Sequence, residues 1–182
     1  MARSGMTDLI AQVRRLVNES GTATWTDDQL EDTLDRYRVD VWGEELIAAP
    51  VYSGGSVVYN DYLMATRDVE GTASTDGWRL YNSNGESASG YTLYPERGLV
   101  RFTADQRGTA YWADYRTYDP YLAAADLWAE KAGQQAGKYD FGTGSDKFSR
   151  SQWFRHCREM ASEMRMRAKP QVVQSTRRDV NP

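Results

Sequence analysis

The spacing of apolar residues changes twice along this chain of 182 residues, and no other feature constrains its fold as strongly. Near both ends, apolar residues recur at intervals of three and four, which is the period of an amphipathic helix. Between residues 51 and 118 they alternate in short runs separated by Gly- and Pro-containing turns, which is typical of strands. The order helix, helix, sheet, helix, helix therefore predicts an α+β protein.

Two helices are expected before the strand-like region. The first covers Thr7–Glu19, with Thr7 or Asp8 as its N-cap. The second covers Thr26–Gly43, where Thr26 and Gln29 have the spacing of a capping box. Each segment carries apolar residues along one helical face, so both helices are predicted to pack on a core.

Short alternating runs predict the strands of the central region, at residues 57–59, 78–81, 91–94, 99–102 and 110–115. The turns Tyr94–Gly98 and Asp105–Gly108 have Pro or Asp early and Gly late, as tight hairpin connections do. Consecutive strands joined by short turns predict an antiparallel meander of four or five strands. The loop Asn82–Gly90 is expected to project from it.

Two further helices follow the strands. Asp119 is the predicted N-cap of a helix over Pro120–Lys138, because Pro is favoured at the first helical position. After a loop at residues 139–147, Ser149 caps a helix over Arg150–Ala168. Residues 170–182 form a polar tail.

These elements predict one fold class, an α+β protein with a four-helix core made of two N-terminal and two C-terminal helices. An antiparallel β-meander lobe is inserted between the helical pairs, and a C-terminal tail extends from the core. The expected units are residues 1–49 (first helical pair), 50–118 (β lobe), 119–169 (second helical pair) and 170–182 (tail).

Charge is unevenly distributed along the chain, whose formal net charge is -4. Residues 150–182 carry eight Arg or Lys residues against three acidic residues, so the rest of the chain is strongly acidic. An acidic body with a basic C-terminal arm can bind other copies of itself or an acidic partner. The last helix predicts a packed stripe at Trp153, Cys157, Met160 and Met164, with arginines on the solvent side.

Recognisable catalytic chemistry is sparse. The only histidine, His156, is adjacent to the only cysteine, Cys157, and consecutive helical residues point about 100° apart. The segment Gly142–Lys147 lacks the spacing of a phosphate-binding loop. One cysteine excludes an intramolecular disulfide framework and a multi-cysteine metal site. No cofactor, metal, signal peptide or membrane span is expected, and an enzyme built on a carboxylate pair stays open.

Aromatic residues are abundant, with 12 Tyr and 6 Trp, and such side chains suit interfaces because they combine an apolar body with a polar tip. Several of them alternate within the predicted strands. One hypothesis is therefore a virion decoration or carbohydrate-binding module that uses the aromatic β lobe, with Trp78 and Trp112 as the residues to test.

Four segments resemble a known pattern. LIAQVRRLVNE and WTDDQLEDTLDRYRVD are similar to the paired N-terminal helices of head–tail connector (adaptor) proteins of long-tailed phages and related gene transfer agents. YDPYLAAADLWAEKAGQQAGKYDF and KFSRSQWFRHCREMASEMRMRAKP are similar to the third and fourth helices of that family. The resemblance covers roughly residues 7–49 and 111–170, and the order of elements carries it more than any single motif.

The resemblance implies a structural, non-enzymatic subunit of a ring, usually of twelve copies, in the virion neck below the portal, assembled in the host cytoplasm. Such rings extend the DNA channel, let packaged DNA pass without specific binding, and present a surface to a stopper or tail-completion protein. It implies lateral contacts between copies, with acidic faces against basic ones, here Arg155, Arg158, Arg165, Asp27, Asp28 and Glu31. It also implies that the tail reaches the portal through Gln171, Val172, Val173, Gln174, Arg177 and Arg178.

Overall fold

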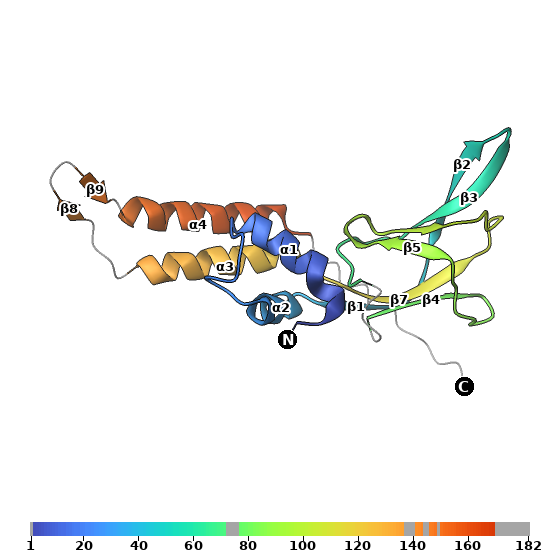
Figure 1. The fold of residues 1–182 in the computed structure, drawn as a ribbon, viewed down its shortest axis with the longest axis horizontal. Helices are drawn as coiled ribbons and strands as arrows, with labels where there is room; N and C mark the ends of the chain where they lie inside the picture. The colour runs from blue at the N-terminus through green and yellow to red at the C-terminus, as the bar shows by residue number, and fades with distance from the viewer. Residues whose placement is uncertain (1, 72–76, 137–140, 144–145, 149, 170–182) are drawn as a thin grey trace.

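The computed structural model describes residues 2–71, 77–136, 141–143, 146–148 and 150–169. The molecule is elongated, with the helices at one end and two β-sheets at the other (Figure 1). The sequence-predicted strands over 78–81, 91–94 and 99–102 are confirmed within one residue.

The N-terminal helices are shorter than expected. A 3₁₀ turn, η1 (Ser4–Met6), leads into α1 (Thr7–Leu16), so Met6 holds the N-cap position without a side-chain bond, and the predicted cap by Thr7 or Asp8 is wrong. Helix α2 spans Asp27–Asp35, and its capping box is confirmed, since Thr26 Oγ1 accepts a hydrogen bond from the backbone N–H of Gln29. Its predicted continuation to Gly43 is wrong because the chain turns into a strand at Val39.

The C-terminal helices form a long antiparallel hairpin (Figure 1). Helix α3 spans Pro120–Gln135, and the predicted cap is confirmed because Asp119 Oδ1 accepts from the N–H groups of Tyr121 and Leu122 at 3.0 and 3.1 Å. Helix α4 spans Arg150–Arg167. Between them, where a loop was expected, β8 (Phe141–Thr143) pairs with β9 (Asp146–Phe148).

Two antiparallel sheets make up the other half of the molecule. Sheet A has the order β1-β7-β4, with β1 at Val39–Glu45, β7 at Tyr111–Thr117 and β4 at Trp78–Asn82. Sheet B has the order β2-β3-β6-β5, with β2 at Ile47–Ser53, β3 at Ser56–Leu63, β6 at Leu99–Phe102 and β5 at Tyr91–Tyr94. A second 3₁₀ turn, η2 (Pro95–Arg97), joins β5 to β6.

The two sheets share a core of their own. Leu46, which links β1 in sheet A to β2 in sheet B, is buried between them. Tyr62 packs edge-on against Phe102 and Tyr111, with ring centroids 5.5 and 5.3 Å apart. This core consists of Leu46, Tyr62, Met64, Val69, Leu80, Val100, Phe102, Tyr111, Ala113 and Tyr115. Burial of these side chains stabilises the β part.

A separate core lies among the helices. Helices α1 and α2 lie against α3, and α3 packs along α4. The stripe predicted on α4 is confirmed for Cys157 and Met164, which are buried there, whereas Trp153 is exposed. The main members are Leu9, Ile10, Val13, Val17, Leu30, Leu34, Ala124, Leu127, Trp128, Cys157, Ala161 and Met164.

The predicted four-helix core with an inserted meander lobe is therefore wrong. The β region begins at Val39, forms sheets of three and four strands, and encloses its own core. Its strands pair out of chain order, β3 with β6 and β4 with β7, so they are not a meander. The physical reason is that β1 finds its backbone partners in β7, far along the chain, and this tertiary pairing overrides the helix-compatible pattern of residues 39–43. Strand β2 pairs with the next strand, β3, in a local hairpin.

A buried ionic cluster joins the two halves. The carboxylate of Glu70 is completely buried and accepts a hydrogen bond from the hydroxyl of Tyr118 at 2.8 Å. Arg3 Nε and Arg116 Nη1 lie 3.5 and 3.6 Å from the same carboxylate. A hydrogen bond to Asp35 raises the pKa of Arg3, and burial raises the pKa of Tyr118. The cluster therefore holds together the N-terminus, the sandwich formed by sheets A and B, and the segment that leads into α3.

Candidate interaction surfaces

The most prominent surface feature is a β-hairpin arm, which we define as residues 47–63 of β2 and β3. The arm projects beyond the rest of the sandwich (Figure 1). Its turn contains Gly54 and Gly55, both with positive φ (+58° and +87°), as the tight turns of two-residue hairpins require. The sequence placed a strand only at residues 57–59 and missed the partner strand.

The arm exposes apolar side chains on both of its faces. Near the turn, Val51 pairs with Val58 and Tyr52 pairs with Val57, and successive pairs in a hairpin point to opposite faces. Tyr52 is 75% exposed. The exposed large apolar residues of the arm are Ile47, Val51, Tyr52, Val57 and Leu63.

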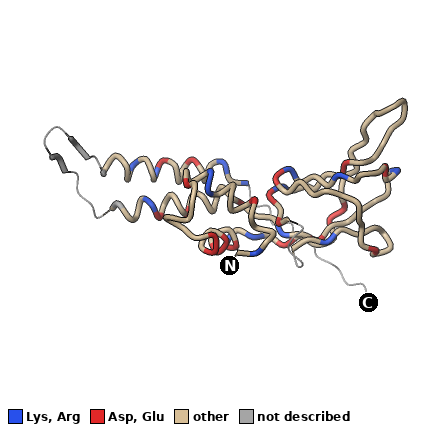
Figure 2. Tube along the Cα trace, viewed as in Figure 1, with Lys and Arg blue, Asp and Glu red and all other residues tan. Residues whose placement is uncertain are grey.

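Charge is nearly absent from the arm (Figure 2). Its only charged residue is Asp61, and this carboxylate is held by Arg101 of β6 at 2.7 Å through two hydrogen bonds. Solvated faces of antiparallel sheets are normally polar. A projecting, uncharged hairpin with exposed aliphatic and aromatic side chains therefore indicates a protein interaction surface.

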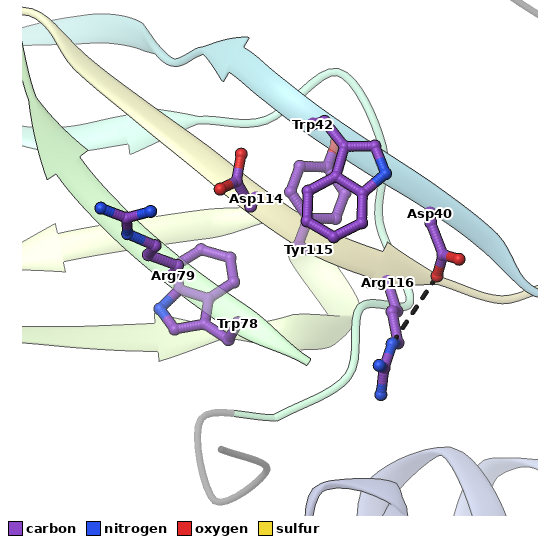
Figure 3. A pocket seen from close by; sticks show the side chains of 7 residues that line it. All are labelled: Asp40, Trp42, Trp78, Arg79, Asp114, Tyr115 and Arg116. Carbon is purple, nitrogen blue, oxygen red and sulfur yellow. Dashed lines mark ion pairs between the residues drawn. The ribbon is translucent and has the colours of Figure 1, made fainter. Parts of the chain in front are cut away.

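A recess of about 190 Å³ is the second feature, and it lies on sheet A (Figure 3). Strands β1, β4 and β7 each contribute side chains to it. The lining residues are Asp40, Trp42, Trp78, Arg79, Asp114, Tyr115 and Arg116.

The polar groups of the recess are arranged across neighbouring strands. Asp40 faces Arg116 in register, with Oδ1 3.6 Å from Arg116 Nε. Asp114 faces Arg79 and uses Oδ1 to accept from the backbone N–H of Gly43 at 2.7 Å. The guanidinium of Arg79 lies 4.9 Å from the ring centre of Tyr81. Two acidic and two basic side chains thus surround the recess, and its charge is balanced.

Trp42 stands at the edge of this recess with 72% of its surface exposed. It lies where the register of β1 against β7 shifts between Val41 and Glu44, and Gly43 takes a positive φ of +61° there. A bulge of this kind re-aims a side chain away from the regular pleat. Sequence reasoning placed Trp42 on a helix and so missed it. The alternation of Val39 and Val41 with polar neighbours, followed by Gly43, was the available signal for a strand.

The residues predicted to join neighbouring copies have mixed surroundings. Arg155 and Arg158 line an open recess on α4 with Phe154, and Arg165 lies 3.7 Å from Asp126. Asp28 is exposed at the start of α2. Asp27 and Glu31 form ion pairs within the chain.

Asp27 Oδ1 accepts from Arg14 at 2.7 Å, and Glu31 is buried with its carboxylate 3.0 Å from Arg3 Nε. Glu31 therefore contributes to the joint between the two halves. The six tail residues predicted to bind the portal lie outside the described residues: Gln171, Val172, Val173, Gln174, Arg177 and Arg178.

The residues singled out for other functions differ in burial: Cys157 is buried, Trp78 and Trp112 are half-buried, and His156 is exposed. Trp78 donates its indole N–H to the hydroxyl of Tyr91 at 2.8 Å and packs against the sandwich core. Trp112 is half-buried on β7. The ring of His156 lies 5.8 and 5.4 Å from the rings of Trp128 and Trp153. Cys157 is buried, and burial raises the pKa of its thiol, which disfavours the nucleophilic thiolate.

Comparisons with protein-family models, with curated proteins and with solved structures found no match to this chain. None of the helices in the described part of the chain combines the length and apolar character needed to span a bilayer. Among the same residues, no group of His, Cys, Asp and Glu side chains is placed to hold a metal ion.

Proposed function

We propose that this chain is a structural head–tail adaptor subunit that forms a ring below the portal, extends the DNA channel and joins the head to a stopper or tail-completion protein. The ring would assemble from copies of the same chain, about twelve, in the virion neck. The proposal combines the resemblance of the helical segments to connector proteins with the surfaces that this chain exposes.

The observation that carries the proposal is the β-hairpin arm. A monomer in water would leave Val51, Tyr52 and Val57 uncovered on a projecting hairpin, at a cost of roughly 25 cal/mol for each Å² of apolar surface. Exposed apolar surface of this kind is typical of chains that function in an assembly. The acidic body suits a channel through which DNA slides, because it repels phosphates instead of binding them.

The non-enzymatic part of the proposal is supported by the surroundings of the most reactive side chains. His156 is exposed on α4, with its ring edge-on to Trp128 and tilted against Trp153, and Cys157 is buried in the core with a raised pKa. The recess on sheet A has two carboxylates, but each is hydrogen-bonded or ion-paired with a neighbouring strand. These groups hold strands together, which is a structural role.

Binding to the portal protein of the same genome tests the function. Full-length chain and a version ending at Lys169 are compared by pull-down and by cryo-EM of the complexes. Truncation after Lys169 retains the ion pair of this residue with Asp68, at 2.7 Å, so the folded body stays anchored. We expect a ring of full-length chain on the portal and loss of binding on truncation. Failure of the full-length chain to bind would refute the adaptor role.

A further inference from the structure

The two most exposed aromatic side chains of the described residues are Tyr52, at the tip of the arm, and Trp42, beside the recess on sheet A. They belong to different sheets and face different surroundings. We infer that Tyr52 of one copy inserts into the recess beside Trp42 of a second copy, and that this contact joins neighbouring subunits. This inference rests on the proposed ring function, for which it names the interface between subunits.

The sizes of the two surfaces are compatible. An apolar cavity of about 150 Å³ holds a benzene ring. The recess has about 190 Å³, which leaves room for a phenol ring and its hydroxyl group. The arm narrows to a two-residue turn at Gly54 and Gly55, so its tip is slim enough to enter a depression in a sheet.

The recess offers the contacts that a tyrosine ring uses. The indole of Trp42 is open to stacking, and the exposed guanidinium of Arg79 already lies over one aromatic ring, that of Tyr81. Guanidinium groups stack on aromatic faces. The carboxylate of Asp114 can accept a hydrogen bond from the phenol hydroxyl through Oδ2, since Oδ1 already accepts from the backbone N–H of Gly43 and from the hydroxyl of Tyr81. Trp, Tyr and Arg are also the residues most often found at energetic hot spots of interfaces.

Charge favours this pair of surfaces over others on the molecule. Copies of a chain with a formal net charge of -4 carry a net mutual repulsion. The arm carries no charge before Asp61, and the recess combines Asp40 and Asp114 with Arg79 and Arg116. An uncharged arm entering a charge-balanced recess therefore avoids the repulsion between bodies.

The geometry makes the contact intermolecular and repeating. The arm extends from sheet B away from the rest of the molecule, whereas the recess belongs to sheet A (Figure 1). Each copy then uses two different surfaces, one as donor and one as acceptor of an arm. Head-to-tail contacts of this kind close into a ring when the rotation between copies divides a full turn.

Complementation between two single variants tests the inference. Tyr52→Ala removes the tip of the arm and leaves the recess intact, whereas Trp42→Ala alters the recess and leaves the arm intact. We expect each variant alone to lose at least tenfold in self-association, measured by sedimentation velocity and mass photometry over a concentration series. Mixed in equal amounts, the two variants should form heterodimers that grow no further, because each has one competent surface.

Trp153→Ala is the matched control, because Trp153 is an exposed tryptophan at the helical end of the molecule, 45% exposed. It should associate like the unmodified chain. Circular dichroism should show an unchanged thermal midpoint for Tyr52→Ala and Trp42→Ala, since both side chains are exposed.

Several outcomes would overturn the inference. Unaltered association of both single variants would do so, as would mixtures that contain only monomers, or equal losses for Trp153→Ala and Trp42→Ala. An unmodified chain that stays monomeric at every concentration yet binds the portal would refute this interface and leave the adaptor role standing. If Trp42→Ala abolished binding to a glycan array while association was unchanged, the recess would belong to a carbohydrate instead.

Discussion

The Nε atom of Arg3 lies 3.5 Å from the buried carboxylate of Glu70, so the N-terminus of the chain is tied by an ion pair to the segment that precedes β4. Arg116 of β7 and Tyr118, just before α3, approach the same carboxylate. Three separate parts of the sequence thus meet at one buried side chain.

Replacing Glu70 with alanine is expected to lower the free energy of unfolding by about 3–5 kcal/mol, the usual cost of removing one partner from a buried ionic cluster. The loss arises because Arg3 and Arg116 would remain in place without their shared counter-charge. Urea unfolding followed by tryptophan fluorescence measures it. Glu96→Ala is the control: Glu96 forms an exposed ion pair with Arg15 at 3.4 Å, and its loss should cost less than about 1 kcal/mol. Equal effects of the two changes would contradict a structural role for the cluster.

Gly98→Ala should destabilise the sandwich through a clash with main-chain atoms. Gly98 has a positive φ of +61°, and a Cβ atom there would overlap the backbone carbonyl oxygen of Thr66. Gly54→Ala is a matched comparison, because Gly54 has a φ of +58° but open space around a Cβ atom. Both variants carry the strain of an alanine in the left-handed region. The difference between their free energies of unfolding therefore measures the clash alone, and it should be about 1–3 kcal/mol. Thermal unfolding at low protein concentration measures both. Similar thermal midpoints for the two variants would show that the backbone near Gly98 shifts to accommodate the Cβ atom at little cost.

Several tyrosines are expected to ionise at a higher pH in the folded protein than in the unfolded chain. Burial, followed by the hydrogen bond to Asp126, raises the pKa of Tyr37 to about 12, and burial raises the pKa of Tyr62 to about 12. Burial also raises the pKa values of Tyr111, Tyr115 and Tyr118. Absorbance at the phenolate band is followed as the pH is raised, with and without urea. A group of tyrosines that ionises above the usual pH range should appear only in the folded chain.

The sign of the linked stability change follows from these shifts. A tyrosine with a raised pKa in the folded state binds its proton more tightly there than in the unfolded chain. Its contribution is complete below about pH 10, the pKa of an unperturbed tyrosine, and is lost as the pH rises from about 10 to 12. Tyr37→Phe should therefore flatten the fall in stability over this range, measured by urea unfolding at several pH values. An unchanged slope would refute the assignment to Tyr37.

Asp119→Ala should destabilise the start of α3 by about 1–2 kcal/mol, because the side chain caps two backbone N–H groups. Its second oxygen also accepts from the backbone N–H of Lys169 at 2.8 Å, so the end of α4 should become more accessible to proteolysis. Thr26→Ala removes the capping box of α2 and should cost about 1 kcal/mol without changing cleavage near Lys169. Cleavage that is equally fast in both variants would show that Asp119 does not anchor α4.

Local sequence patterns predicted the features that depend on neighbouring residues alone. The caps at Thr26 and Asp119 form because a side chain reaches N–H groups two or three residues away, whatever the rest of the chain does. Strands β4, β5 and β6 were predictable from alternation between strong turn residues. The clearest failure is at β1, where the residues are compatible with a helix and the outcome depends on a distant partner strand, β7. Strand β2 was also missed, although its partner β3 is the next strand along the chain.

What the amino-acid sequence determined by itself is therefore the set of caps and turns and much of the strand pattern. Tertiary structure alone decided that residues 39–45 form a strand, because β7, far along the chain, supplies their hydrogen-bond partners. The recess also depends on tertiary structure, because Asp40, Arg79 and Asp114 come together there from three segments that are far apart in the sequence. The exposure of Trp42 follows from the same long-range pairing, because a bulge in β1 aims its side chain outward. Tyr52 is exposed because the local hairpin of β2 and β3 projects from the molecule.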